Sequence, residues 1–311
     1  MKPDGKTRRV ALVTGCDSAE GIGQALCREL VTRGFLVFAT GLSLEAMAPL
    51  HDFALEQIRT MVLDVTSEPQ VEHVIGQVVA EAGGVDVLIN NAGIAALAPS
   101  IETDLAVARR VHEVNFWGTW ATCKAAGRRM ADRRRGVIVN IGSMASRGHP
   151  PFTAAYNTSK AAAESLTHAL RLELAPYGVA VVYVAPTWCR TAITANASLA
   201  GEEEWQAGRY GAIREDVVRE ASGVYLPCAW PPARIARQIV DAALRNRPPM
   251  VVYGGGQHRI LGFLAAWMPR WVPDWVIWHK SGLARLARLV AADPAGAAGD
   301  ANGGAAATAS R

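Results

Sequence analysis

Short apolar runs rich in β-branched residues alternate along this chain with amphipathic stretches of about 10 to 15 residues. The runs are typical of buried strands, and the stretches, whose apolar positions recur every three to four residues, are typical of helices. Strands are predicted at residues 10–14, 36–40, 61–63, 85–89, 137–141, 179–185 and 250–253. Helices are predicted at residues 21–33, 68–82, 105–131, 155–177 and 233–244. This alternation predicts an α/β fold in which helices cover both faces of one doubly wound parallel sheet of six or seven strands.

The regular alternation fades between residues 187 and 230. A loop-rich insertion of that length in a compact domain is usually functional, so we expect it to form a lid over a substrate. The single regular domain is expected to span residues 8–255, followed by an aromatic-rich C-terminal extension at 256–290. The Ala- and Gly-rich tail at 291–311 is of low complexity and is expected to be disordered.

The C-terminal extension is the most unusual segment of the sequence. Four tryptophans recur in it at helical spacing: Trp267, Trp271, Trp275 and Trp278. Pro269 and Pro273 are expected to break any continuous helix, and Arg270 and Asp274 make the segment too polar to span a bilayer. Three interpretations stay open: a cap on the domain core or on another subunit, an apolar roof over the substrate, and peripheral membrane contact through residues 260–290.

Composition and charge narrow the function classes. Of the 311 residues, 50% are hydrophobic and 19% are charged, which excludes global disorder. The net charge is only +4 and the basic residues are spread among acidic ones, so nucleic acid is not an expected partner. The five cysteines form no C-x-x-C pair, which argues against a metal site and for reduced thiols. Because the N-terminus lacks an apolar signal segment, a cytoplasmic location is expected.

The first predicted strand is followed by a glycine-rich turn, T-G-C-D-S-A-E-G-I-G, at residues 14–23. Glycines in such a turn let the backbone approach a pyrophosphate, and free N–H groups at the start of the next helix face its negative charge. The turn therefore predicts a dinucleotide site. The structural alternative is a glycine-rich turn that merely joins a strand to a helix.

Three side chains between residues 143 and 160 suit acid–base chemistry on one oxygen atom. Tyr156 and Lys160 are four positions apart in a predicted helix, so they lie on one face, one turn apart. A nearby cation lowers the pKa of a phenol, which makes Tyr156 a candidate general acid and base. Ser143 follows a predicted buried strand, where catalytic groups of parallel sheets often lie. The structural alternative is a solvated helix face for the pair and a turn position for the serine.

Three further motifs follow in order: N-N-A-G at residues 90–93, V-N-F-W-G with Asn115, and P-T-W-C-R-T at residues 186–191. With the glycine-rich turn and the three side chains above, they make the chain resemble the short-chain dehydrogenase/reductase family over residues 8–255. The resemblance implies a Rossmann fold that binds NAD(P). Members similar to retinol and hydroxysteroid dehydrogenases also have proline- and aromatic-rich C-terminal segments, which implies a small lipophilic substrate.

The resemblance also assigns roles to particular residues. The catalytic group that it implies consists of Asn115, Ser143, Tyr156 and Lys160, in which the asparagine holds a water beside the lysine. The cofactor-binding residues that it implies are Thr14, Gly15, Gly21, Ile22, Gly23, Asp64, Val65, Asn91, Ala92, Gly93, Tyr156, Lys160, Pro186 and Thr191. Among these, Asp64 and Val65 are placed beside the adenine, and Thr191 is placed at the nicotinamide carboxamide. No metal ligand is implied.

The sequence departs from the family pattern at two positions. Five residues, 16–20, separate the first two glycines of the glycine-rich turn, where the family usually has three. Thr187 replaces the glycine that usually follows the proline at position 186. The turn that would hold the phosphates is therefore longer, and the contacts of its extra residues cannot be transferred from the family.

The choice between NAD and NADP is made at the end of the second strand, where an acid binds a ribose 2′-hydroxyl and an arginine accommodates a 2′-phosphate. The segment F-A-T-G-L-S at residues 38–43 contains neither residue type. Thr40 and Ser43 could donate hydrogen bonds to a phosphate, whereas Glu20 argues for NAD. On this balance we favour NADP over NAD.

The sequence thus predicts an NAD(P)-dependent oxidoreductase that interconverts an alcohol with a ketone or aldehyde of steroid, retinoid or acyl-chain type. Ser143 is expected to hydrogen-bond the substrate oxygen, Tyr156 to exchange a proton with it, and Lys160 to lower the phenol pKa and bind the nicotinamide ribose. The alternative is a catalytically idle dinucleotide-binding regulator on the same fold. The family also implies a homodimer or homotetramer.

Overall fold

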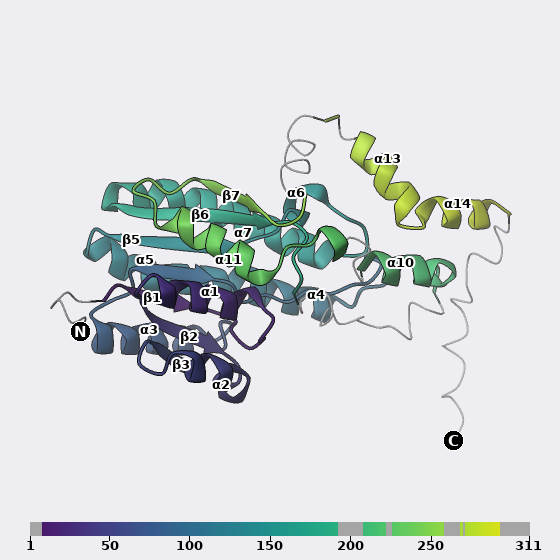
Figure 1. Ribbon diagram of the computed structural model, residues 1–311. Helices are drawn as coiled ribbons and strands as arrows, with labels where there is room; N and C mark the ends of the chain where they lie inside the picture. The colour runs from purple at the N-terminus through teal and green to yellow at the C-terminus, as the bar shows by residue number, and fades with distance from the viewer. Residues whose placement is uncertain (1–7, 192–207, 222–225, 258–267, 270, 293–311) are drawn as a thin grey trace, which may run out of the picture.

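Seven parallel strands form one sheet in the computed structural model, which describes residues 8–191, 208–221, 226–257, 268–269 and 271–292 (Figure 1). The strands are β1 (Val10–Val13), β2 (Leu36–Gly41), β3 (Ile58–Val62), β4 (Val87–Asn90), β5 (Gly136–Ile141), β6 (Val179–Pro186) and β7 (Val251–Gly254). Their order in the sheet is β3-β2-β1-β4-β5-β6-β7, so the chain changes its direction of growth between β1 and β4. In sheets of this kind, ligands bind at the carboxyl ends of the strands beside that switch. The predicted fold class is confirmed.

Helices cover both faces of the sheet, which explains why its central strands are apolar throughout. On one face lie α1 (Ile22–Thr32), α2 (Leu44–Phe53) and α11 (Pro232–Ala243), with α1 and α11 side by side (Figure 1). On the other face lie α3 (Glu68–Ala82), α5 (Thr119–Asp132) and α7 (Ala154–Leu174). The other α-helices in the described part of the chain are α4 (Leu105–His112), α6 (Ala145–Gly148), α10 (Arg214–Ala221), α13 (Trp271–Lys280) and α14 (Leu283–Ala292).

One strand boundary and one helix differ from the sequence prediction. β3 begins at Ile58, three residues before its predicted start. It is the edge strand and only its first residue is fully buried, so it lacks the continuous apolar run of a central strand. α2 was not predicted, although Ser43 caps it by accepting a hydrogen bond from the N–H group of Ala46 at 3.2 Å.

A π-helical turn, Glu113–Gly118, interrupts the helix predicted at residues 105–131 and separates α4 from α5. Such turns often occur at functional sites. This one carries Asn115, which is only 1% exposed. Gly118 ends the turn beneath Val65, since a Cβ atom on this glycine would lie 2.6 Å from Val65 Cγ2. The turn therefore packs closely on the residue predicted to contact the adenine.

The predicted lid at 187–230 is more regular than expected, because it contains α10. Two of its residues join a small buried apolar cluster, which consists of Leu97, Ala98, Phe152, Ile213 and Val217. This cluster links the segment to the loop after β4 and to the start of α7. Residues 192–207 and 222–225 of the predicted lid lie outside the described residues.

α14 lies against the same apolar cluster. Leu283 and Leu286 pack on it, and Arg285 Nη1 lies 3.2 Å from Asp216 Oδ2 of α10. These contacts favour the cap interpretation for this helix. Residues 291 and 292 of the tail that was expected to be disordered belong to α14, and the tail from position 293 onward lies outside the described residues.

α13 exposes its tryptophans to a large extent. Trp271, Trp275 and Trp278 are 71%, 62% and 44% exposed. Residues 268 and 269 are not helical and α13 begins only at Trp271, so Pro269 lies outside this helix. Pro273 is the third residue of α13, in the first turn, where proline is tolerated, and it does not break the helix. Trp267 lies outside the described residues. Membrane contact through residues 260–290 stays a prediction, and none of the described helices is both long and apolar enough to cross a bilayer.

Candidate active site

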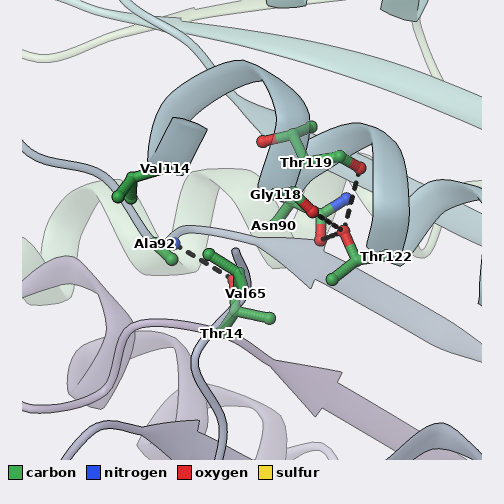
Figure 2. A pocket seen from close by; sticks show the side chains of 8 residues that line it. All are labelled: Thr14, Val65, Asn90, Ala92, Val114, Gly118, Thr119 and Thr122. Carbon is green, nitrogen blue, oxygen red and sulfur yellow. Dashed lines mark hydrogen bonds between the residues drawn. The ribbon is translucent and has the colours of Figure 1, made fainter. Parts of the chain in front are cut away.

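The N-N-A-G segment after β4 holds the glycine-rich turn in place. Thr14 Oγ1 accepts hydrogen bonds from the backbone N–H groups of Asn91 at 3.0 Å and of Ala92 at 3.1 Å, the latter drawn in Figure 2. Asn91 Nδ2 donates to the carbonyl oxygens of Thr14 and Gly15 at 3.0 and 2.9 Å. Gly15 has a φ of +70°, and a Cβ atom on it would lie 2.6 Å from Ala92 Cα. The two segments therefore meet backbone to backbone, which only a glycine permits here.

The start of α1 is open to an anion. Gly21 is its N-cap and has no side chain that could accept a hydrogen bond from the N–H groups of the first turn. The first turn, from Ile22 on, contains no acidic residue. Gly23 lies directly on the turn, because a Cβ atom there would be 2.5 Å from Gly15 O and 2.8 Å from Asn91 Nδ2. Free N–H groups at a helix start beside a close backbone turn fit a pyrophosphate.

Gly23→Ala is expected to weaken NAD(P)H binding by at least about tenfold and to lower the free energy of unfolding by about 1–3 kcal/mol, because the added methyl group has no space. Gly76→Ala is the matched control, since a Cβ atom at Gly76 in α3 would meet no atom within 4 Å. It should raise the free energy of unfolding by about 0.5–1 kcal/mol and leave binding unchanged. Chemical denaturation and titration of NADH fluorescence measure the two quantities. Equal effects of the two substitutions would contradict the steric role of Gly23.

A small pocket lies beside the turn, between the carboxyl ends of β1 and β4 and the start of α5 (Figure 2). Its lining residues are Thr14, Val65, Asn90, Ala92, Val114, Gly118, Thr119 and Thr122. Thr14, Val65 and Ala92 among them are predicted cofactor residues. Asn90 instead donates from Nδ2 to Asn140 Oδ1 at 2.8 Å and so ties β4 to β5. This asparagine therefore steadies the sheet.

Asp64 lies after β3 in a turn that its own side chain closes. Asp64 Oδ1 accepts from the backbone N–H group of Thr66 at 2.9 Å and from Thr66 Oγ1 at 2.7 Å. Burial acts to raise the pKa of Asp64, but the two hydrogen bonds and the charge of Arg110 outweigh it and hold this pKa below its usual range. The carboxylate thus shapes the turn that presents Val65, and the adenine contact predicted for both residues stays a prediction.

The predicted catalytic side chains converge at the carboxyl ends of β4 and β5. Lys160 Nζ lies 5.8 Å from the centre of the Tyr156 ring, and the Ser143 side chain acts to lower the pKa of the phenol. Asn115 Oδ1 and Lys160 Nζ lie 3.2 and 3.3 Å from the position that a Cβ atom on Gly93 would occupy. The structure therefore brings all four side chains together at the edge of the sheet that also carries the glycine-rich turn.

Backbone groups hold Lys160 and Asn115. Lys160 is 4% exposed, and its Nζ donates to the carbonyl oxygen of Ile141 at 2.9 Å. Asn115 Oδ1 accepts from the backbone N–H group of Ile94, and Asn115 Nδ2 donates to the carbonyl oxygen of Ile94, both at 2.9 Å. Asn115 Nδ2 also donates to Ser159 Oγ. Asn115 thus fixes the loop after β4 beside the lysine, and the water-holding role that the resemblance implies for it stays a prediction.

Burial is the largest influence on the pKa values of Tyr156 and Lys160. It lowers the pKa of Lys160 to about 8. It also raises the pKa of Tyr156, because it disfavours the phenolate more strongly than the hydrogen bond with Ser143 favours it, and Cys189 adds to this rise. The sequence-based expectation of a lowered phenol pKa is therefore wrong for this arrangement of side chains.

Two side chains near Ser143 were not predicted. Tyr183 on β6 is fully buried, and its Oη accepts from the backbone N–H group of Ser143 at 3.3 Å. Gly142 makes room for the ring, since a Cβ atom on it would overlap the phenol. The signal for Tyr183 is a tyrosine in the otherwise aliphatic run V-A-V-V-Y-V-A. Cys189, whose thiol pKa burial raises to about 12, had no such signal, because its effect on Tyr156 depends on the path of the chain after β6.

The P-T-W-C-R-T segment also reaches the site. Pro186 ends β6, and its carbonyl oxygen accepts from the N–H group of Met144, next to the predicted catalytic serine, at 2.9 Å. Thr187, which stands where the family has glycine, donates from Oγ1 to the carbonyl oxygen of Gly254 at 3.0 Å and so ties the segment to β7. Thr191 is the last described residue before position 192, and its cofactor contact stays a prediction.

A doubly wound parallel sheet with a glycine-rich turn beside the switch between β1 and β4 defines the class of dinucleotide-binding Rossmann proteins. Within this class, the family model described as short chain dehydrogenase matches residues 9–201. The chain belongs to the short-chain dehydrogenase family. It is an oxidoreductase of that family, whose members bind NAD(P).

Individual relatives resemble the chain over most of its length. A short-chain dehydrogenase of Penicillium ochrochloron is 34% identical over 278 residues, which cover 89% of this chain and 99% of that protein. An NADPH-dependent 1-acyldihydroxyacetone phosphate reductase of Schizosaccharomyces pombe is 39% identical over 180 residues, 58% of this chain and 59% of the relative. The crystal structure of a short-chain dehydrogenase from Streptomyces avermitilis matches with a TM-score of 0.71 at 27% identity and covers 90% of this chain and 98% of its own. The predicted homodimer or homotetramer and the predicted cytoplasmic location stay predictions.

Proposed function

We propose that this protein interconverts an alcohol with a ketone or aldehyde by hydride transfer with NAD(P), and that Ser143, Tyr156 and Lys160 carry the acid–base chemistry. The observation that supports this most directly is the convergence of a serine, a tyrosine and a buried lysine beside the glycine-rich turn. A hydroxyl, a phenol and an ammonium at one point can bind and protonate a single carbonyl oxygen.

In the direction of reduction, the bound nicotinamide supplies the hydride. Ser143 and Tyr156 hydrogen-bond the carbonyl oxygen, and Tyr156 Oη transfers its proton to that oxygen as the general acid. The raised pKa keeps this phenol protonated at neutral pH, as a proton donor must be. Lys160 stabilises the phenolate that the transfer leaves behind for as long as its amine is charged, and burial restricts the charged amine to pH values below about 8.

We further propose that the substrate is lipophilic, of the steroid, retinoid or acyl-chain type. Two groups near the proposed site carry no charge. Burial keeps the thiol of Cys189 neutral, and Ile94, whose backbone N–H group donates to Asn115, is 37% exposed. The acyl group in the name of the Schizosaccharomyces pombe relative supports an acyl chain. Apolar surface of this kind binds a substrate mainly by removing hydrocarbon from water.

The purified protein, incubated with NADH or NADPH and with pairs of ketones that differ only in the length of an alkyl chain, tests this proposal. We expect oxidation of the cofactor, with a kcat/KM that rises at least about tenfold over a few added methylene groups, since each buried methylene contributes about 0.8 kcal/mol. Absorbance at the nicotinamide band measures the rate. Equal kcat/KM along each pair would exclude the lipophilic site, and bound cofactor without turnover of any pair would favour the idle regulator.

A further inference from the structure

The lengthened glycine-rich turn brings a carboxylate to the end of β2. Asp17 Oδ1 accepts a hydrogen bond from the backbone N–H group of Ser43 at 2.9 Å. Both carboxylate oxygens lie 2.5 Å from the position that a Cβ atom on Gly41 would occupy. Gly41 is the last residue of β2 and is buried. The carboxylate of Asp17 therefore stands where a side chain of residue 41 would begin.

The end of the second strand is the place where dinucleotide folds distinguish their two cofactors. An acidic side chain there accepts a hydrogen bond from the ribose 2′-hydroxyl, and its negative charge repels a 2′-phosphate. β2 itself ends in a glycine, and the acid arrives from the neighbouring turn. We propose that Asp17 is the residue that selects the cofactor and that it makes the protein prefer NAD(H) over NADP(H). This inference rests on the proposed function only for the identity of the cofactor class.

Hydrogen bonds on both sides fix the turn that carries Asp17. The backbone N–H group of Cys16 donates to the carbonyl oxygen of Thr40 on β2 at 2.9 Å. Gln24 Nε2 donates to the carbonyl oxygens of Cys16 and of Ala46 on α2, both at 3.1 Å. Asp17 Oδ2 makes no hydrogen bond or ion pair with any described residue, so it is available as an acceptor. A fixed carboxylate with one free oxygen is suited to bind a ribose hydroxyl.

The hydroxyls that favoured NADP in the sequence have other partners in the structure. Thr40 is 0% exposed and donates from Oγ1 to the carbonyl oxygen of Val13 at 3.2 Å. Ser43 Oγ accepts from the N–H group of Ala46 as the N-cap of α2. Leu42 between them is 63% exposed and uncharged. None of these three side chains offers a positive charge to a 2′-phosphate, so the geometry points away from the NADPH dependence in the name of the Schizosaccharomyces pombe relative.

Equilibrium binding to the whole protein tests the inference without any turnover. Titration of nicotinamide fluorescence is expected to show that wild-type protein binds NADH at least about tenfold more tightly than NADPH. Asp17→Asn removes the charge but keeps an oxygen that can accept from Ser43. It should reduce this preference at least about tenfold, mainly by tightening the binding of NADPH. Asp52→Asn is the matched control, because Asp52 is an exposed acid near the C-terminal end of α2, away from the end of β2, and it should leave the ratio within about twofold.

Three results would overturn the role of Asp17: a wild-type preference for NADPH, an unchanged ratio in Asp17→Asn, or an equal shift in Asp52→Asn. If Asp17→Asn does not fold, calorimetry of wild-type protein with adenosine 5′-monophosphate and adenosine 2′,5′-bisphosphate decides, since tighter binding of the bisphosphate would reject the inference. These measurements report binding alone. Their failure is therefore distinct from failure of the proposed catalysis, which shows as a loss of turnover.

Discussion

Replacing Tyr156 by phenylalanine is expected to reduce kcat by about 10²- to 10⁴-fold and to leave the dissociation constant of NAD(P)H within about twofold. The ring stays and fills the same space, so the site near Ser143 and Lys160 keeps its shape. The variant lacks only the hydroxyl that would transfer a proton to the substrate oxygen. Steady-state kinetics and titration of nicotinamide fluorescence separate the two effects.

Tyr177→Phe is the matched control for that loss. Tyr177 follows the end of the same helix, is 50% exposed and lies far along the chain from the site. Its hydroxyl should contribute nothing to turnover or to binding. If Tyr156→Phe kept kcat within about threefold of the wild-type value, Tyr156 would not be the general acid.

Lys160→Met is expected to separate activity from stability. Burial lowers the pKa of Lys160 to about 8, against 10.5 for a free lysine, so the buried charge destabilises the folded state by about 3.4 kcal/mol at pH 7. Methionine has a similar length and no charge. We therefore expect kcat to fall by about 10²-fold, while the free energy of unfolding at pH 7 stays equal or rises. Denaturant titrations of both proteins measure this difference.

The pH dependence of stability has a definite sign for this lysine. Between pH 8 and 10.5 the unfolded chain binds the lysine proton and the folded chain does not, so the free energy of unfolding of the wild type should rise with pH in that window. This rise should be absent in Lys160→Met. Lys124→Met is the control, because Lys124 lies at the surface beside Glu68 and should change stability by less than about 1 kcal/mol. A loss of several kcal/mol at pH 7 in Lys160→Met would show that the ammonium is a net stabilising group.

The secondary structure of the domain could be predicted because it follows local periodicity. The predicted helix at residues 68–82 coincides with α3, and the ends of β1 and β2 lie within one residue of their predicted positions. β3 and α2 were less predictable. β3 is half exposed at the sheet edge, so it lacks the apolar pattern of a buried strand. α2 contains Pro49, and a proline inside a segment argues against a helix in the sequence, although Ser43 caps this one. Pattern alone is weakest where burial is partial.

The sequence by itself determined which residues could meet locally: four-residue spacing placed Lys160 near Tyr156, and strand ends placed Ser143 and Asn91 at one edge of the sheet. Only the tertiary structure decided three other features. It places the carboxylate of Asp17 beside Gly41, it brings Tyr183 into hydrogen-bond contact with Ser143, and it raises the pKa of Tyr156 instead of lowering it. The physical reason is that periodicity acts along a few neighbouring residues. Burial and contact across a sheet instead depend on how distant segments pack, and no single segment encodes that.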